Sequence, residues 1–169
     1  MRLAAATAAV IIGLDQISKL IVVHWLGLAE RLAIDVLPPY LNFRMAWNRG
    51  VNFGLFASDG EATRWVLIAV ALAICAFVWL WVGSELRAGN AVPDPWRARP
   101  RVQLSAGLLV GGALGNVIDR LAYGAVADFI NMSCCGIDNP FAFNLADAAI
   151  FAGAVGLVLF TGAGGKKTP

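Results

Sequence analysis

The sequence predicts an all-α polytopic membrane protein with four transmembrane helices and a small extracytoplasmic segment that contains β structure. Of its 169 residues, 59% are hydrophobic and only 14% are charged, and the mean hydropathy is +0.71. A soluble domain of this size needs a larger charged surface. Apolar stretches near residues 3–28, 65–82, 102–121 and 143–161 are each long enough to cross a hydrocarbon core of about 30 Å. We therefore expect one membrane-embedded domain over residues 1–169.

The first stretch follows Arg2 and resembles the start of a cleaved signal peptide. However, no small-residue cleavage site follows its apolar core, and the apolar run continues past Lys19 to Trp25, which favours a retained helix. Asp15 and Lys19 are spaced i, i+4 and can pair on one helical face. This pair is either a helix-stabilising contact that anchors packing or a support for a site on a neighbouring helix.

Residues 29–63 form the longest segment between two apolar stretches. The alternation of Leu41-Asn42-Phe43-Arg44-Met45 predicts a short strand. Residues 47–56 mix glycine, asparagine and arginine with aromatic residues, a composition that cannot cross lipid but can lie on its surface. Two interpretations stay open, a connecting loop and an element that covers a bound substrate.

The second stretch carries no polar feature and is interpreted as scaffold. The third contains Gly107, Gly111 and Gly115 at four-residue spacing, which lets another helix backbone approach closely. Residues 125–130 follow as a short extended piece.

Polar and ionisable residues gather at the ends of the third and fourth stretches: Asn116, Asp119, Arg120, Asp128, Asn144 and Asp147. Such groups are costly at the edge of a bilayer, so they tend to face a protein interior and to serve a function. Two carboxylates brought together can share one proton, which is the chemistry of aspartyl hydrolysis. Asp147 alone has a simpler explanation, since a carboxylate near a helix N-terminus complements the helix dipole. Asp119 adjoins Arg120, and we expect that guanidinium to hold it ionised in a structural role.

Charge and cysteine content exclude several function classes. A net charge of +2 does not indicate nucleic-acid binding. Three cysteines and one histidine form no zinc set of usual spacing, and neither a metal, a cofactor nor thiol chemistry is expected.

The distribution of basic residues predicts the orientation in the membrane. Seven basic residues fall at the termini and in the loop before the third stretch, against four on the other side, so both termini are expected inside.

Five blocks together resemble the lipoprotein signal peptidases, the type II signal peptidases of bacteria, in that family's order and over nearly the whole chain. The blocks are Asp15-Gln16-Ile17-Ser18-Lys19, Asn48-Arg49-Gly50-Val51-Asn52-Phe53-Gly54, residues 111–120 (GGALGNVIDR), Val126-Ala127-Asp128-Phe129 and Phe143-Asn144-Leu145-Ala146-Asp147.

The resemblance implies an aspartic endopeptidase of the bacterial inner membrane. Such an enzyme removes the signal peptide of diacylglyceryl-modified prolipoproteins, cutting before the lipidated cysteine at the extracytoplasmic rim. By position, Asp128 and Asp147 match the catalytic pair. The supporting or substrate-binding positions are matched by Asp15, Lys19, Asn48, Gly54, Asn116, Asp119, Arg120 and Asn144. The resemblance also implies membrane lipid and globomycin-type inhibitors as partners, and we expect a monomer.

Asn52, Ala148 and the 131–142 connection with Cys134 and Cys135 depart from the family pattern. Two other functional classes agree less well with the sequence. A proton-coupled transporter places its charges near the midplane and shows repeated halves, which this chain does not. A purely structural membrane protein leaves the grouped aspartates unexplained.

Overall fold

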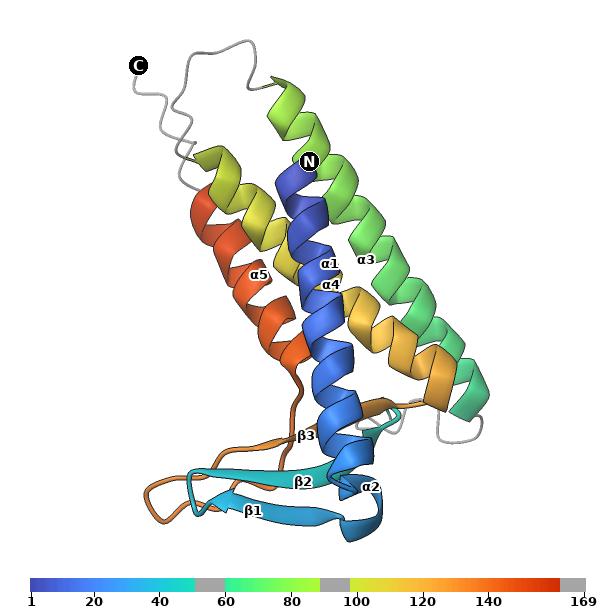
Figure 1. Ribbon diagram of the computed structural model, residues 1–169. Coiled ribbons are helices and arrows are strands. Elements are labelled where there is room, and N and C mark those ends of the chain that lie inside the picture. Colours follow the sequence, from blue (N-terminus) through green and yellow to red (C-terminus); the bar gives the residue numbers. More distant parts are fainter. Residues whose placement is uncertain (51–59, 89–97, 162–169) are drawn as a thin grey trace.

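The computed structural model describes residues 1–50, 60–88 and 98–161, which form a helix bundle with a small antiparallel sheet across one end (Figure 1). Gly54 and Asn52, singled out from the sequence, lie outside these described residues. The long helices are α1 (Arg2–Lys19, continued by the π-helical turn η1, Leu20–Trp25), α3 (Gly60–Ala88), α4 (Ala98–Tyr123) and α5 (Leu145–Thr161).

The predicted helical membrane architecture is confirmed. Three helical segments, Arg2–Trp25, Glu61–Ser84 and Pro100–Tyr123, are long and apolar enough to cross a membrane. The fourth helix, α5, is apolar but has only 17 residues, which corresponds to about 26 Å of helix. It lies beside the longer helices in the same bundle (Figure 1).

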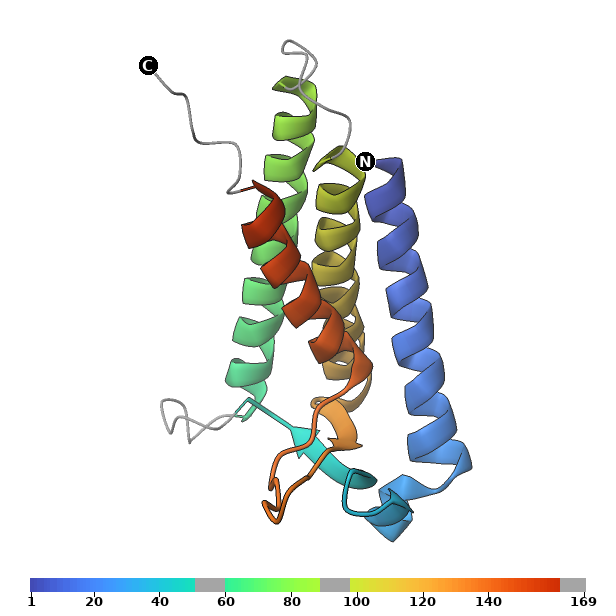
Figure 2. The ribbon, with the colours of Figure 1, turned by 90° about the vertical axis from the view of Figure 1, so that its left-hand side faces the viewer.

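Helix α4 is central, because it contacts α1, α3 and α5 (Figure 2). Glycines on α4 and on α5 explain how closely α1 and α5 approach α4. A Cβ on Gly107 would lie 2.6 Å from the Ala4 carbonyl oxygen of α1, and one on Gly153 of α5 would lie 2.5 Å from the Leu109 nitrogen of α4. Small residues therefore set the helix spacing, as the glycine pattern predicted for α4.

The sheet has the order β1-β2-β3, formed by Ala33–Leu37, Leu41–Asn48 and Val126–Asn131. The strand predicted at 41–45 is confirmed and extends to Asn48, and the extended piece after Gly124 is β3. The sequence analysis did not identify β1. In the β2–β3 register, Ala46 opposes Asp128 and Asn48 opposes Val126, so Asn48 lies beside the Asp128 block.

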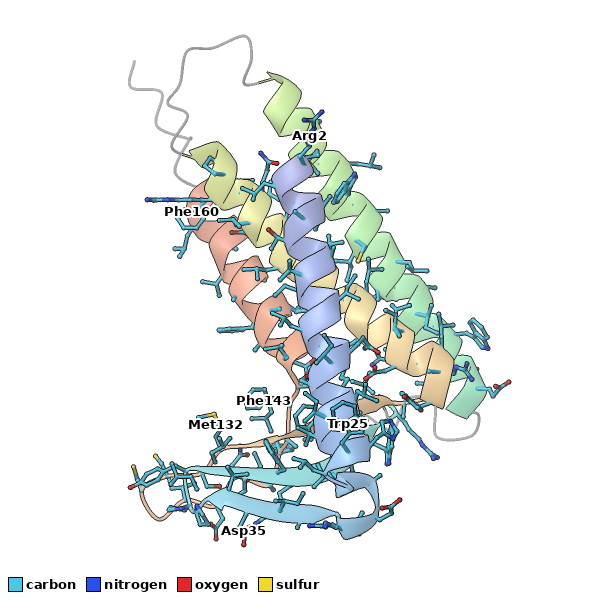
Figure 3. The ribbon with its side chains drawn as sticks, viewed as in Figure 1. Arg2, Trp25, Asp35, Met132, Phe143 and Phe160 are labelled. Carbon is cyan, nitrogen blue, oxygen red and sulfur yellow. The ribbon has the colours of Figure 1, made fainter. Side chains whose placement is uncertain are left out.

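An apolar core joins the sheet to the end of the first helix, where η1 continues α1. Val23, Leu28 and Phe129 are almost completely buried there, and Phe43 packs edge-on against Phe129 with ring centroids 5.9 Å apart. The π-helical turn ends at Trp25, Gly27 follows with a φ of +68°, and the single turn α2 (Leu28–Arg31) leads into β1. This core fixes the sheet against the end of the bundle that is remote from Arg2 (Figure 3).

The 131–142 connection, which matched no family block, is an ordered loop. The Asn131 amide donates to the carbonyl oxygens of Asn139 (2.7 Å) and Phe141 (2.9 Å). Cys134 and Cys135 are exposed and free, with their sulfur atoms 2.7 Å apart. The loop returns the chain to Phe143, which pairs with Ile130 beside β3 and leads into α5.

Candidate active site

The first turn of α5 places Asp147. Asn144 precedes the helix, and its side-chain oxygen accepts the Asp147 N–H at 2.8 Å. In return, the Asp147 carboxylate accepts the Asn144 N–H at 3.4 Å. This reciprocal arrangement is a capping box, which satisfies two N–H groups that the helix itself leaves without partners. The dipole explanation for Asp147 therefore holds locally, but it leaves one carboxylate oxygen for other partners.

That second oxygen of Asp147 is bound by α4. The Asn116 Nδ2 donates to Asp147 Oδ1 at 2.8 Å, while the Asn116 oxygen accepts from the Asn144 amide at 3.2 Å. Asn116 follows Gly112 by one helical turn. Gly112 lies directly against Ala146 of α5, so this face of α4 delivers Asn116 to the start of α5.

Asp128 lies on β3, and only 3% of its surface is exposed. Its Oδ1 accepts from the Asn144 Nδ2 at 2.7 Å, and its Oδ2 accepts from the Asn48 Nδ2 of β2 at 3.1 Å. Burial, and next the charge of Asp147, raise the pKa of Asp128 to about 6, although the hydrogen bonds from Asn48 and Asn144 oppose this rise. Asp128 is thus a carboxyl group that can hold a proton up to about pH 6.

Asn144 links Asp128 to the residue that carries the second carboxylate, Asp147. Its side chain is fully buried and bonds Asp128 at one end and the Asp147 backbone at the other. The structure therefore brings together Asp128, Asp147, Asn48, Asn116 and Asn144 from β2, β3, α4 and the start of α5. We call these five residues the amide-lined site.

Asp15, Lys19 and Asp119 form a second group, which we call the ion-paired cluster. Lys19 Nζ lies 2.7 Å from a carboxylate oxygen of each aspartate, and all three side chains are buried. The predicted Asp15–Lys19 pair is confirmed. Because Lys19 also binds Asp119 of α4, this pair is both an internal contact of α1 and a link to the neighbouring helix.

The expectation that Arg120 holds Asp119 is wrong. Asp119 pairs with Lys19, and its Oδ1 accepts from the Gln16 side chain at 3.0 Å. Consecutive residues on a helix do not face each other. Asp119 therefore lies on the same face of α4 as Gly111 and Gly115, which is directed toward α1, while Arg120 lies on a different side of the helix. Sequence adjacency was therefore a misleading signal.

Arg120 is half-buried, and its side chain makes no hydrogen bond or ion pair with any residue that the structure describes. Its charge interacts most strongly with Asp147, then with Asp128 and Asp119. Arg120 is one helical turn after Asn116, which explains its orientation toward the start of α5. It supplies positive charge near the amide-lined site without binding either carboxylate directly.

Gln16 was missed as a site residue. Its amide donates to Asp15 Oδ2 at 3.1 Å and to Asp119 Oδ1 at 3.0 Å, within the ion-paired cluster. A glutamine beside Asp15 has no spacing that distinguishes it from a surface residue, so the only available signal was its place in the Asp15-Gln16-Ile17-Ser18-Lys19 block.

The amide-lined site has the parts that general acid–base hydrolysis requires. Two carboxyl groups held in one place can share a proton. One can accept a proton from water while the other donates a hydrogen bond to a carbonyl oxygen.

Comparisons with known proteins agree with this chemistry. A family model described as Signal peptidase (SPase) II matches residues 7–162. The lipoprotein signal peptidase of Methylorubrum extorquens (strain PA1) is 43% identical over 151 residues, which cover 88% of this chain and 78% of that protein. The lipoprotein signal peptidase of Methylobacterium sp. (strain 4-46) is 41% identical over 159 residues, covering 94% of this chain and 88% of that protein.

Two solved structures, both described as bacterial membrane enzymes studied by the in meso method, share the fold. One superimposes with a TM-score of 0.70 at 26% identity and covers 98% of this chain and 94% of its own. The other has a TM-score of 0.67 at 24% identity and covers 98% of this chain and 93% of its own. The chain therefore belongs to the signal peptidase II family, the aspartyl proteases of membranes that process prolipoproteins.

Proposed function

We propose that Asp128 and Asp147 are the catalytic pair with which this protein cleaves diacylglyceryl-modified prolipoproteins before the lipidated cysteine. The observation that carries this proposal is the single buried amide of Asn144, which bonds Asp128 and the Asp147 backbone and so holds both carboxyl groups in one place. Neither carboxylate is ion-paired within the described residues, in contrast to Asp15 and Asp119.

Asp128 is the group that holds the proton in the free enzyme. Its burial and its raised pKa favour the neutral form, which can donate a hydrogen bond to the scissile carbonyl oxygen. We assign the opposite role to Asp147, which lies in the first turn of α5 and interacts with the charge of Arg120. Asp147 therefore accepts the proton of the attacking water.

Asn48, Asn116 and Asn144 orient the two carboxyl groups through neutral amides. A cation bound directly to either carboxylate would hold it ionised, whereas amide donors fix its position and let it exchange a proton. Arg120 adds positive charge that offsets part of the repulsion between the pair. Gly54 is proposed to contribute to substrate binding.

The sheet end of the bundle is proposed to face the extracytoplasmic side of the bacterial inner membrane. Arg2 lies at the opposite end (Figure 3), and so does the start of α4, which carries Arg101; the cytoplasmic basic residues are expected there. A diacylglyceryl anchor keeps the substrate in the bilayer, so a site at the rim receives the bond beside the lipidated cysteine at the correct depth. The described residues 29–50 of the 29–63 segment, which include β1 and β2, then lie on the side from which the substrate is proposed to be covered.

The direct test is cleavage by the purified protein in detergent, with no added cofactor. A prolipoprotein carrying the diacylglyceryl group should be cut before its modified cysteine, and the same polypeptide without lipid should be cut far more slowly. A globomycin-type inhibitor should block the reaction. Equal cleavage of both substrates would contradict the lipid-dependent function, and no cleavage by a folded monomer would contradict the activity.

A further inference from the structure

Each carboxylate of the ion-paired cluster has a second partner, and the two partners are related. Asp15 Oδ1 accepts the backbone N–H of Ala146 at 3.0 Å, and Asp119 Oδ2 accepts the backbone N–H of Ala127 at 3.1 Å. Ala146 directly precedes Asp147, and Ala127 directly precedes Asp128. The cluster therefore binds the chain one residue before each member of the proposed catalytic pair.

Both of these N–H groups donate to a side chain that belongs to another element. Ala146 is in the first turn of α5, where the helix provides no acceptor for its N–H. The Ala127 N–H points to a side chain of α4 although Ala127 itself pairs with Trp47 across the sheet. Both groups are buried, so the carboxylates remove a cost that an unpaired N–H would impose.

The cluster is built to hold one geometry. Lys19 is 5% exposed and its Nζ lies 2.7 Å from both carboxylates, while Gln16 donates to both of them. Charges this deeply buried strongly disfavour any arrangement that separates them, and such groups can fix one register of the elements that carry them. Here the elements are α1, α4, β3 and α5.

We propose that Asp15 and Asp119, joined through Lys19, are positioning residues that set the separation of Asp128 and Asp147. This inference rests on the proposed catalytic role of that pair. The separation matters because the repulsion between two carboxylates determines the difference in pH between the loss of the first proton and the loss of the second. Activity needs one group ionised and the other protonated, so the separation also sets the pH range of activity.

Gly115 offers a test that leaves every charged and catalytic residue in place. A Cβ at Gly115 would lie 2.8 Å from Asp15 Oδ2, whereas its contact with the Ala146 Cβ would be an ordinary 3.5 Å. Gly115→Ala should therefore fold by displacing the Asp15 side chain. Gly107→Ala is the matched control on the same helix, because its Cβ would meet the Ala4 carbonyl oxygen at 2.6 Å, far from the cluster.

We expect Gly115→Ala to lower kcat by about 10- to 100-fold per folded molecule, with KM nearly unchanged. Asp128 faces the charges of Asp147 on α5, Lys19 on α1 and Arg120 on α4. If the pair moves apart, the repulsion that keeps Asp128 protonated weakens. The alkaline limb of the kcat profile should then move to lower pH by more than about half a unit. Gly107→Ala should lower the thermal midpoint, with the wild-type kcat and pH profile retained per folded molecule.

A second pair of variants tests the Asp15 hydrogen bond itself. Asp15→Asn keeps an oxygen for the Ala146 N–H and leaves Lys19 paired with Asp119, so it should recover most of the activity that Asp15→Ala loses. The proposal is overturned if Gly115→Ala and Asp15→Ala keep the wild-type kcat, or if kcat falls without a change of pH profile. Asp128→Asn in the same assay separates the catalytic claim from the positioning claim. If this variant keeps its activity, the catalytic pair is refuted, whereas the hydrogen bonds of the ion-paired cluster are not in question.

Discussion

The amide-lined site and the ion-paired cluster use the same residue type for different purposes. Both contain two aspartates within the same end of the bundle, and both include buried carboxyl groups. In the cluster, Lys19 forms an ion pair with both Asp15 and Asp119, each at 2.7 Å. In the amide-lined site, neutral asparagine amides hold Asp128 and Asp147. We infer from this comparison that the partner, more than burial, distinguishes the carboxylates proposed to position the chain from those proposed to exchange protons.

The largest expected effect is the loss of either member of the amide-lined pair. Asp128→Asn and Asp147→Asn should each lower cleavage by about three orders of magnitude or more, because an amide can neither accept the proton of water nor share one. The measurement is the cleavage rate of a lipidated prolipoprotein per folded molecule. A near wild-type rate in either variant would end the aspartyl assignment and return Asp119 to consideration.

A smaller loss is expected when the ion-paired cluster loses one charge. Asp119→Asn should lower yield and thermal stability, since Lys19 keeps only Asp15 as a charged partner, while the folded fraction retains part of its activity. Thermal unfolding and the rate per folded molecule distinguish the two effects. Complete inactivity of a fully folded Asp119→Asn protein would remove the distinction between the two groups.

The pH dependence of kcat/KM should report on the free amide-lined site. Asp128 must be protonated for its proposed role, and its pKa is raised to about 6, so kcat/KM should fall as the pH rises through that value. Rates at low substrate concentration across about pH 4 to 9 give the profile. Rising activity up to pH 9 would contradict the assignment of the proton to Asp128.

The protonation of Asp128 should also make the stability of the folded protein depend on pH. The pKa of Asp128 is higher in the folded protein than in an unfolded chain, so its contribution to stability is present below about pH 4 and lost as the pH rises through about 6. The thermal midpoint of the wild type should therefore fall relative to that of Asp128→Asn over this range. A difference that stays constant with pH would show that the fold does not perturb Asp128.

The smallest effects are expected outside both groups. Replacing Cys75, Cys134 and Cys135 by serine should change the rate by no more than a few-fold, and EDTA should leave it intact, because no metal or thiol has a role in the proposed reaction. Complete loss of activity with EDTA at constant lipid and detergent would indicate a metalloenzyme.

The sequence predicted the helical membrane fold because apolar length is a strong local signal, and α1, α3 and α4 follow it directly. The strand around Leu41–Met45 was visible in its alternation, whereas β1 was missed because its five residues carry no comparable pattern. The family blocks identified the residues of the amide-lined site, and the structure supplies how Asn144 joins them.

Other features depend on orientation and cannot be read along the chain. Asp119 was assigned to its sequence neighbour Arg120, but the helical rotation between consecutive residues directs Asp119 to Lys19. The bonds from Asp15 to Ala146 and from Asp119 to Ala127 involve backbone N–H groups, which have no sequence signature at all.

The most direct measurement of the central claim is the comparison of Asp128→Asn, Asp147→Asn and the double variant in one single-turnover assay on a lipidated prolipoprotein. If the two carboxyl groups act as one proton-sharing unit, the double variant should be scarcely slower than either single variant. Two partial losses that multiply in the double variant would show that the groups act independently, and the shared-proton mechanism would be wrong.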